Sequence, residues 1–208
     1  MTTFEIFSVN NYEKANKYFI NNNQIIYDTI DELVNELKSD KYYHFRIHNN
    51  KNYIFFGDLD NFIHGINKFK EIIISFLKNQ YNIIIEDNDI KYTINNKNNN
   101  SYHYTIPKLY CNINKLKEIH NNIIKKNNDV FISNNEKKVK KSIDTTIYSD
   151  HWFRCPNQSK GNIIDIINNN QHIIFFGEIK DFVIDYIPEN SININYSDFV
   201  DENIFKKK

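Results

Sequence analysis

The aromatic and β-branched run from Tyr53 to Leu59 restricts the fold more than any other segment. Residues of these types favour strands, and a run with so few polar positions indicates a strand buried in the core. The run ends in Asp58-Leu59-Asp60. Because residues i and i+2 face the same side of a strand, the two carboxylates should be presented together while Leu59 points into the core. The segment therefore predicts a core strand that ends in a pair of acids.

Predicted strands and helices alternate along the rest of the chain. We predict strands over residues 43–48, 81–86, 90–94, 101–106 and 172–176, and an apolar strand that ends at Asp144. Segments 43–48 and 53–59 flank an Asn-rich turn and should form a hairpin, as should 81–86 with 90–94. Helical spacing predicts helices over 28–37, 62–77, 112–126 and 179–187. Since several strand pairs look antiparallel, the predicted class is α+β, with mixed or antiparallel sheets flanked by helices.

Length and charge limit the function classes. With 208 residues the chain has room for one well-buried core, so we predict a single domain over residues 1–208. The 26 basic and 26 acidic residues balance, and no global positive field indicates a nucleic-acid partner. Lysines gather between Lys97 and Lys141, a run that solvated helix faces would also explain.

Cysteine content and hydropathy indicate an intracellular, soluble protein that is not secreted. Cys111 and Cys155 are too few for a thiolate zinc site or a disulfide framework. The N-terminal residues lack the basic and apolar regions of a signal peptide, and no run approaches the roughly 18 apolar residues of a membrane span. We expect no membrane partner.

Further polar residues could complete a site around Asp58 and Asp60. Ser101 and His103 would share one face of a strand, where a hydroxyl and an imidazole can donate to phosphate oxygens. Asp144 would supply a third carboxylate if its strand lies beside the first, and three carboxylates suit a pair of Mg²⁺ or Mn²⁺ ions. Arg154 and Lys160 follow it in a predicted loop rich in Gly, Pro and Asn, as candidate phosphate ligands.

Each of these segments, taken alone, also fits an ordinary strand or a solvated loop. A second Asp-x-Asp pair, Asp87 and Asp89, falls in a predicted turn, where Asp normally bonds its own backbone. A third segment, Phe175 to Lys180, repeats the pattern around Asp58 but has Lys in place of the second acid, so we interpret it as structural. Only the order of the whole series indicates a nucleotidyl-transfer site.

The series resembles the catalytic core of archaeo-eukaryotic primases, especially the primase-polymerase branch and the primases of large DNA viruses. The family has an apolar strand ending in Asp-x-Asp or Asp-x-Glu, then Ser-x-His, then an apolar residue and an acid followed by Tyr, Phe-Arg and Ser-Lys. The matching residues are Asp58 and Asp60, Ser101 and His103, and Asp144, Tyr148, Phe153-Arg154 and Ser159-Lys160. The resemblance covers about residues 40 to 190, and the third motif is the most specific because five elements recur in order.

The resemblance implies a DNA-directed primase-polymerase with an RRM-like unit and an N-terminal α/β unit. In that family the three acids hold two Mg²⁺ or Mn²⁺ ions, and the residues matched by His103, Arg154 and Lys160 bind nucleotide phosphates, with Ser101 beside them. The enzyme would transfer a nucleotidyl group from an NTP or dNTP onto a primer or initiating nucleotide on a single-stranded DNA template during replication. No helicase P-loop is present in the sequence, so unwinding would need a separate replicative helicase.

Departures from the family pattern leave other functions open. Family members often have Lys where this chain has Asn99 and Arg where it has His151, and the Cys and His of the zinc module in some relatives are missing, so we expect no zinc. These differences favour an alternative, a catalytically inactive primase-like accessory or single-stranded-DNA-binding subunit. A metal-dependent nuclease is a third hypothesis, but it would leave Arg154 and Lys160 superfluous.

Overall fold

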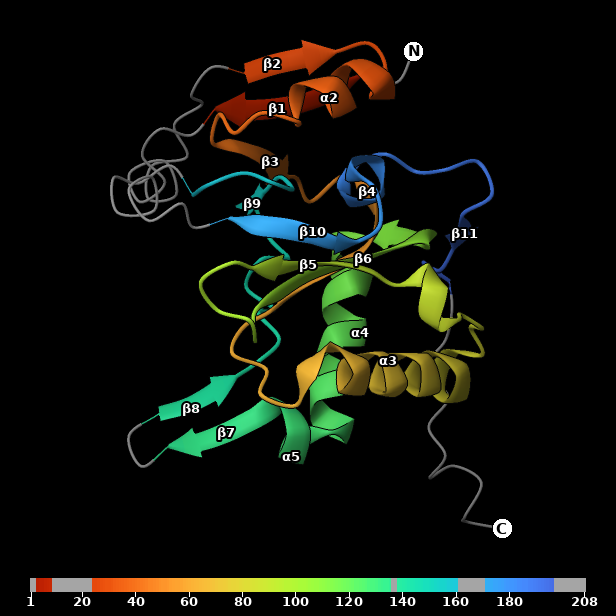
Figure 1. The fold of residues 1–208 in the computed structure, drawn as a ribbon. Helices are drawn as coiled ribbons and strands as arrows, with labels where there is room; N and C mark the ends of the chain where they lie inside the picture. The colour runs from red at the N-terminus through yellow and green to blue at the C-terminus, as the bar shows by residue number, and fades with distance from the viewer. Residues whose placement is uncertain (1–2, 9–23, 136–137, 161–170, 197–208) are drawn as a thin grey trace.

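The computed structural model describes residues 3–8, 24–135, 138–160 and 171–196. One sheet combines N-terminal strands with a strand from much later in the chain (Figure 1). Its order is β2 (Gln24–Tyr27), β1 (Phe4–Ser8), β3 (Tyr43–Ile47) and β9 (His151–Arg154), and all its pairings are antiparallel. The helix α2 (Ile30–Glu36) confirms the helix predicted over 28–37. Thr29 caps it, accepting from the Glu32 amide while the Glu32 carboxylate accepts from the Thr29 amide.

A second sheet forms the other half of the core. It runs β10 (His172–Phe176), β5 (Lys91–Asn95), β6 (Tyr102–Asn112) and β11 (Ile192–Asn193), and β4 (Asn52–Leu59) pairs with β6. These pairings are antiparallel except for β6 with β11. The helices α3 (Gly65–Tyr81) and α4 (Ile113–Lys126) lie on one side of this sheet (Figure 1). The described chain therefore has the predicted α+β class.

The helix α4 shows the predicted periodicity. Asn112 caps it by accepting from the Lys115 amide. Six side chains on one face are buried, as the spacing predicts: Ile113, Leu116, Ile119, His120, Ile123 and Ile124. The helix α3 is likewise confirmed, although it begins at Gly65 and continues to Tyr81, where Asn82 ends it in a left-handed conformation with φ 54°.

The predicted hairpin between residues 43–48 and 53–59 is wrong. The strands β3 and β4 belong to different sheets, because β3 pairs with β1 and β9 whereas β4 pairs with β6. The Tyr53 hydroxyl accepts from the His48 amide at 2.7 Å and donates to the His48 carbonyl at 3.2 Å, which fixes the crossover. Consecutive residues of β4 are buried, so the strand is covered on both faces, which a two-stranded ribbon could not provide.

Two further predicted elements are also wrong. The strand predicted over 81–86 does not form, because α3 extends through Tyr81 and a 3₁₀ turn, η1 (Asp87–Asp89), follows before β5. The predicted hairpin of 81–86 with 90–94 is therefore wrong too, and β5 pairs with β10 and β6. The helix predicted over 179–187 is reduced to the 3₁₀ turn η2 (Ile179–Phe182). It stops there because Val183 is extended and a turn follows at residues 184–185, where the Ile184 carbonyl accepts from the Ile54 amide of β4 at 2.9 Å.

The segment around Asp144 also differs from its prediction. Instead of a strand ending at Asp144, the chain forms a short helix α5 (Asn128–Phe131) and a hairpin of β7 (Ile132–Asn135) and β8 (Lys138–Lys141). This hairpin projects away from both sheets (Figure 1). An isolated bridge between Ile143 and Leu59 then brings the chain beside β4. The strand β9 occupies part of the segment predicted as a loop.

Candidate active site

Main-chain hydrogen bonds place the third acid beside the first two. The Asp144 amide donates to the Asp58 carbonyl at 3.1 Å, and the Asp60 amide donates to the Ser142 carbonyl at 2.7 Å. The bridge between Leu59 and Ile143 lies between these two bonds, and both side chains are buried. The three predicted acids thus converge although more than 80 residues separate Asp60 from Asp144. The predicted neighbourhood of the acids holds, but a bridge makes it and not a strand.

A cavity of about 130 Å³ opens where these segments meet β3, β6 and β9. Every predicted site residue except Ser101 lines it: Asp58, Asp60, His103, Asp144, Arg154 and Lys160. His44, Ile147, His151, Trp152 and Phe153 complete the wall. Acidic and basic groups of the predicted series therefore share one small polar cavity.

Ser101 does not line the cavity but contacts one of its acids. Its hydroxyl contacts Asp60 Oδ1 at 3.4 Å, and it accepts from the Asn61 amide at 3.2 Å and from Asn98 Nδ2 at 3.0 Å. The hydroxyl has one proton, and with both donors directed at it, that proton is left for the Asp60 carboxylate. In this geometry Ser101 orients an acid, whereas the sequence predicted a nucleotide ligand.

The cavity holds its acids in an unfavourable environment. Burial raises the pKa of Asp58 well above its usual value, and the nearby charges of Asp60 and Asp144 raise it further. Burial and Asp144 likewise raise the pKa of Asp60. Arg154 and Lys160 oppose both shifts, so their positive charges act on the same carboxylates. Repulsion among clustered carboxylates is the condition that an added cation relieves.

His103 is clamped between two rings. The His172 ring stacks on it at 3.6 Å between centroids with an interplanar angle of 14°, and the Phe153 ring lies at 4.7 Å. Its Nε2 lies 3.8 Å from Asp58 Oδ2. Burial, followed by the charges of His172 and Arg154, lowers the pKa of His103 well below its usual value. The His103 imidazole is therefore neutral, its orientation is set by the two neighbouring rings, and its Nε2 faces Asp58.

A buried amide anchors the loop that carries Lys160. Gln158 is fully buried, and its Nε2 donates to the Leu37 and Ser39 carbonyls at 3.3 and 2.9 Å. Its Oε1 accepts from the Lys41 and Tyr43 amides at 2.8 and 3.4 Å.

The neighbouring Ser159 hydroxyl and amide both bond to the Asp40 carboxylate. The Ser of the predicted Ser-Lys pair is thus a structural anchor, which fixes where Lys160 enters the cavity.

Tyr148 joins the third motif to the core. Its hydroxyl donates to the Phe56 carbonyl of β4 at 2.8 Å and lies 3.1 Å from His120 Nε2. Tyr104 contacts the same His120 nitrogen. Since His120 Nδ1 lies 2.7 Å from the Leu116 carbonyl, the neutral ring carries its proton on Nδ1 and accepts at Nε2.

Sequence reasoning missed two histidines of the site. His44 is fully buried, lies directly across from Arg154 in the β3 and β9 pair, and lines the cavity. His172 stacks on His103. Both fall in predicted strands, but no motif surrounds either one, and the pairing of distant segments brings them to the site.

The three acids are suitable ligands for divalent cations, but their side chains are not grouped around a common point. Carboxylate oxygens are the hard ligands that Mg²⁺ and Mn²⁺ prefer, and within the described residues Asp58 Oδ1 is buried with no hydrogen-bond partner. Yet in that same part of the chain, no three His, Cys, Asp or Glu side chains stand close enough to hold a metal ion. Asp144 Oδ1 instead accepts from the Thr146 amide and hydroxyl at 2.8 and 2.6 Å.

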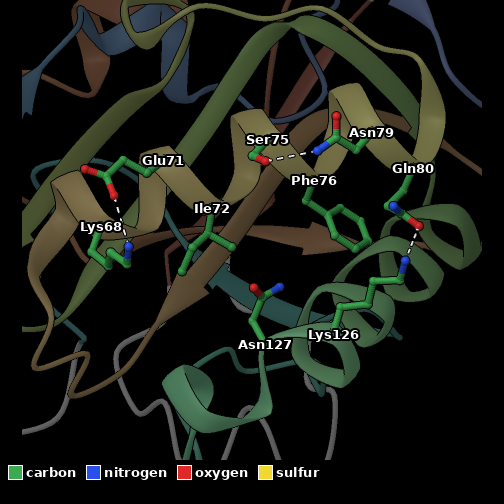
Figure 2. A pocket seen from close by; sticks show the side chains of 9 residues that line it. All are labelled: Lys68, Glu71, Ile72, Ser75, Phe76, Asn79, Gln80, Lys126 and Asn127. Atoms are coloured by element: carbon green, nitrogen blue, oxygen red, sulfur yellow. Dashed lines mark hydrogen bonds and ion pairs between the residues drawn. The ribbon is translucent and has the colours of Figure 1, made fainter. Parts of the chain in front are cut away.

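The other candidate acids lie elsewhere and already have partners. Asp87 pairs with Lys70 at 2.9 Å and Asp89 with Lys108 at 3.0 Å. A second hollow of about 400 Å³ lies between α3 and the end of α4, and most of its polar side chains bond one another in pairs, as Lys68 with Glu71 (Figure 2). None of the predicted site residues lines that hollow.

Comparisons with known proteins add no family assignment. No protein-family model matches the chain, and no curated protein matches its sequence. Among the helices of the described residues, none has the length and apolar character that crossing a membrane requires.

Proposed function

We propose that this chain is a DNA-directed primase-polymerase of the archaeo-eukaryotic primase type. It would join a nucleotide from an NTP or dNTP to a 3′ hydroxyl on a single-stranded DNA template. One observation supports the proposal above all. The three acids and the three phosphate-binding candidates come from separate segments, yet all six line one cavity.

The cavity suggests a division of roles. Asp58, Asp60 and Asp144 would hold two Mg²⁺ or Mn²⁺ ions, after the three carboxylates draw together. Such ions activate the attacking hydroxyl and stabilise the leaving pyrophosphate. Arg154 and Lys160 would bind phosphate oxygens and hold the α-phosphate in line with the hydroxyl, which is a catalytic contribution of position and charge.

The size of the cavity agrees with a phosphate site. About 130 Å³ is less than the roughly 300–1,000 Å³ of pockets that enclose a whole small ligand. The cavity would take the triphosphate and its cations, and the sugar and base would lie at its mouth.

The order of elements gives independent support. The order β4, α3, β5, β6 and α4 agrees with the first five elements of the β-α-β-β-α-β order of a split βαβ unit, and α5, β7, β8 and β9 intervene before β10, the next strand of this sheet. The last strand pairs with β5. In this proposal, the sheet of β1, β2, β3 and β9 with α2 would serve as the N-terminal α/β unit that the resemblance implies.

Primer extension tests this function. Purified protein with Mg²⁺ or Mn²⁺ should extend a labelled primer on a DNA template, and Asp60→Asn and Asp144→Asn should each abolish synthesis. Asp150→Asn is the matched control, because Asp150 is exposed in the same segment as Asp144 and does not line the cavity. Synthesis that survives in both site variants would refute the proposal.

A second candidate is an inactive primase-like accessory that binds single-stranded DNA. Two observations favour it. Among the described residues, no three potential metal ligands form a group that could hold a metal ion, and His151 lies at the cavity wall where relatives often have Arg. Single-stranded DNA binding without metal-dependent nucleotide binding would select this function. Under either function, strand unwinding would require a separate replicative helicase.

A further inference from the structure

We propose that His172, from β10, is a positioning residue that holds the His103 imidazole in the plane needed to contact the nucleotide triphosphate. The inference rests on the proposed function for the identity of the ligand. It concerns a residue outside the three motifs, which lies 69 positions after His103 in the sequence. Its support is the geometry of one buried cluster.

The first support is the ring contact. The His103 and His172 rings lie almost parallel, with 3.6 Å between centroids and 14° between planes. Phe153 covers His103 from another side at 4.7 Å. Both histidines are buried, with 7% and 3% of their surfaces exposed. A ring held between two others cannot rotate about its side-chain torsions without displacing one of them.

The second support is a hydrogen-bond network centred on Thr93. His172 Nδ1 lies 3.1 Å from Thr93 Oγ1, and the same hydroxyl accepts from the His103 amide at 3.3 Å and donates to the His103 carbonyl at 3.4 Å. With its single proton given to that carbonyl, the hydroxyl can only accept from His172. The network therefore assigns the His172 proton to Nδ1.

Asn95 agrees with this assignment. Its Nδ2 is a donor and lies 3.5 Å from His172 Nε2, which must then be the accepting nitrogen. His172 is thus fixed at both ring nitrogens while its face supports His103. One hydroxyl also fixes the His103 backbone, so the ring and the backbone of His103 are held by the same cluster.

Substitutions can separate the two contacts. His172→Phe retains a flat ring against His103 and loses the bond to Thr93, whereas His172→Asn retains a donor near Thr93 and loses the ring. His172→Ala loses both. Ile173→Ala is the matched control, because Ile173 is the next residue of β10, points to the opposite face and is 42% exposed.

Calorimetry with dATP and Mn²⁺ measures the effect on the proposed site. If ring support orients His103, His172→Ala and His172→Asn should weaken dATP binding about tenfold, and His172→Phe should restore it to within about threefold of wild type. Ile173→Ala should bind like wild type. Equal weakening in all three His172 variants, or wild-type affinity in folded His172→Ala, would overturn the inference.

A second measurement does not depend on nucleotide binding. Long-range ¹H–¹⁵N spectra of histidine-labelled protein should show His172 protonated at Nδ1, and the His103 ring signals should shift in His172→Ala but not in Ile173→Ala. An Nε2-protonated His172, or unmoved His103 signals, would overturn the positioning role. Wild-type protein that binds no dATP while showing the expected spectra would instead refute the proposed function alone.

Discussion

A larger residue in place of Gly57, between Phe56 and the first acid, should destabilise the folded protein. It lies directly across from Tyr104 in the β4 and β6 pair. A Cβ at this position would lie 2.3 Å from the Tyr104 hydroxyl oxygen and 2.5 Å from its Cζ, below the 3.0 Å that real Cβ contacts keep. Tyr104 is fully buried and its hydroxyl contacts His120, so the ring has no free direction in which to move.

The cost of Gly57→Ala follows from three contributions. Overpacking a buried site costs about 1–3 kcal/mol, and losing the Tyr104 hydrogen bond costs about 1 kcal/mol. Replacing Gly by Ala in a strand returns about 0.5–1 kcal/mol. The free energy of unfolding should therefore fall by about 2 kcal/mol, and Tm by roughly 4–8 °C for a chain of this size.

Urea denaturation of a double-mutant cycle checks this reasoning. Tyr104→Ala removes the obstructing ring, so adding Gly57→Ala to that background should cost less than about 0.5 kcal/mol, or even stabilise. Additive costs for the two substitutions would show that the Tyr104 ring is not what excludes a side chain at Gly57.

Three other substitutions test the buried polar groups. Burial lowers the pKa of His120 to about 4, so the folded state binds fewer protons than the unfolded state, with a pKa of about 6.5, and stability falls as pH drops from about 6.5 to 4. His120→Gln should reduce that fall by up to about 1.4 kcal/mol per pH unit, and urea titrations with equal slopes would contradict it. Gln158→Leu removes the side-chain partner of four backbone groups and should lower the free energy of unfolding by about 3 kcal/mol in urea denaturation. It should also weaken nucleotide binding, because the loop that carries Lys160 loses its anchor. Tyr148→Phe, which loses the bond to Phe56, should cost about 1–2 kcal/mol, and an unchanged Tm would refute that bond.

Local patterns in the sequence predicted the local elements. The buried face of α4 follows from its 3.6-residue period and its Asn112 cap, both of which depend on neighbours in the chain. The strand at Tyr53 to Leu59 followed from residue type. The pairing of that strand did not, because its partner begins at Tyr102 and the choice of partner depends on the whole core.

In the site, too, the sequence predicted the residue types but not the contacts that depend on tertiary packing. The motifs named the acids and cations that line the cavity, since residue type and order carry that information. They could not show that Ser101 orients Asp60, because the side-chain direction depends on Asn61 and Asn98. Nor could they find His172, which tertiary packing alone brings to His103. The strand β9 was missed because a Pro- and Asn-rich sequence around it favours a loop, and pairing with β3 overrides that preference.

Metal-dependent nucleotide binding tests the central claim most directly. Calorimetry should show dATP or ATP binding that requires Mg²⁺ or Mn²⁺, that Asp60→Asn and Asp144→Asn abolish, and that Arg154→Ala weakens by at least about tenfold. Asp150→Asn should bind like wild type. Binding that is equally strong in EDTA, or unchanged in Asp60→Asn and Asp144→Asn, would contradict a nucleotidyl-transfer site at these three acids.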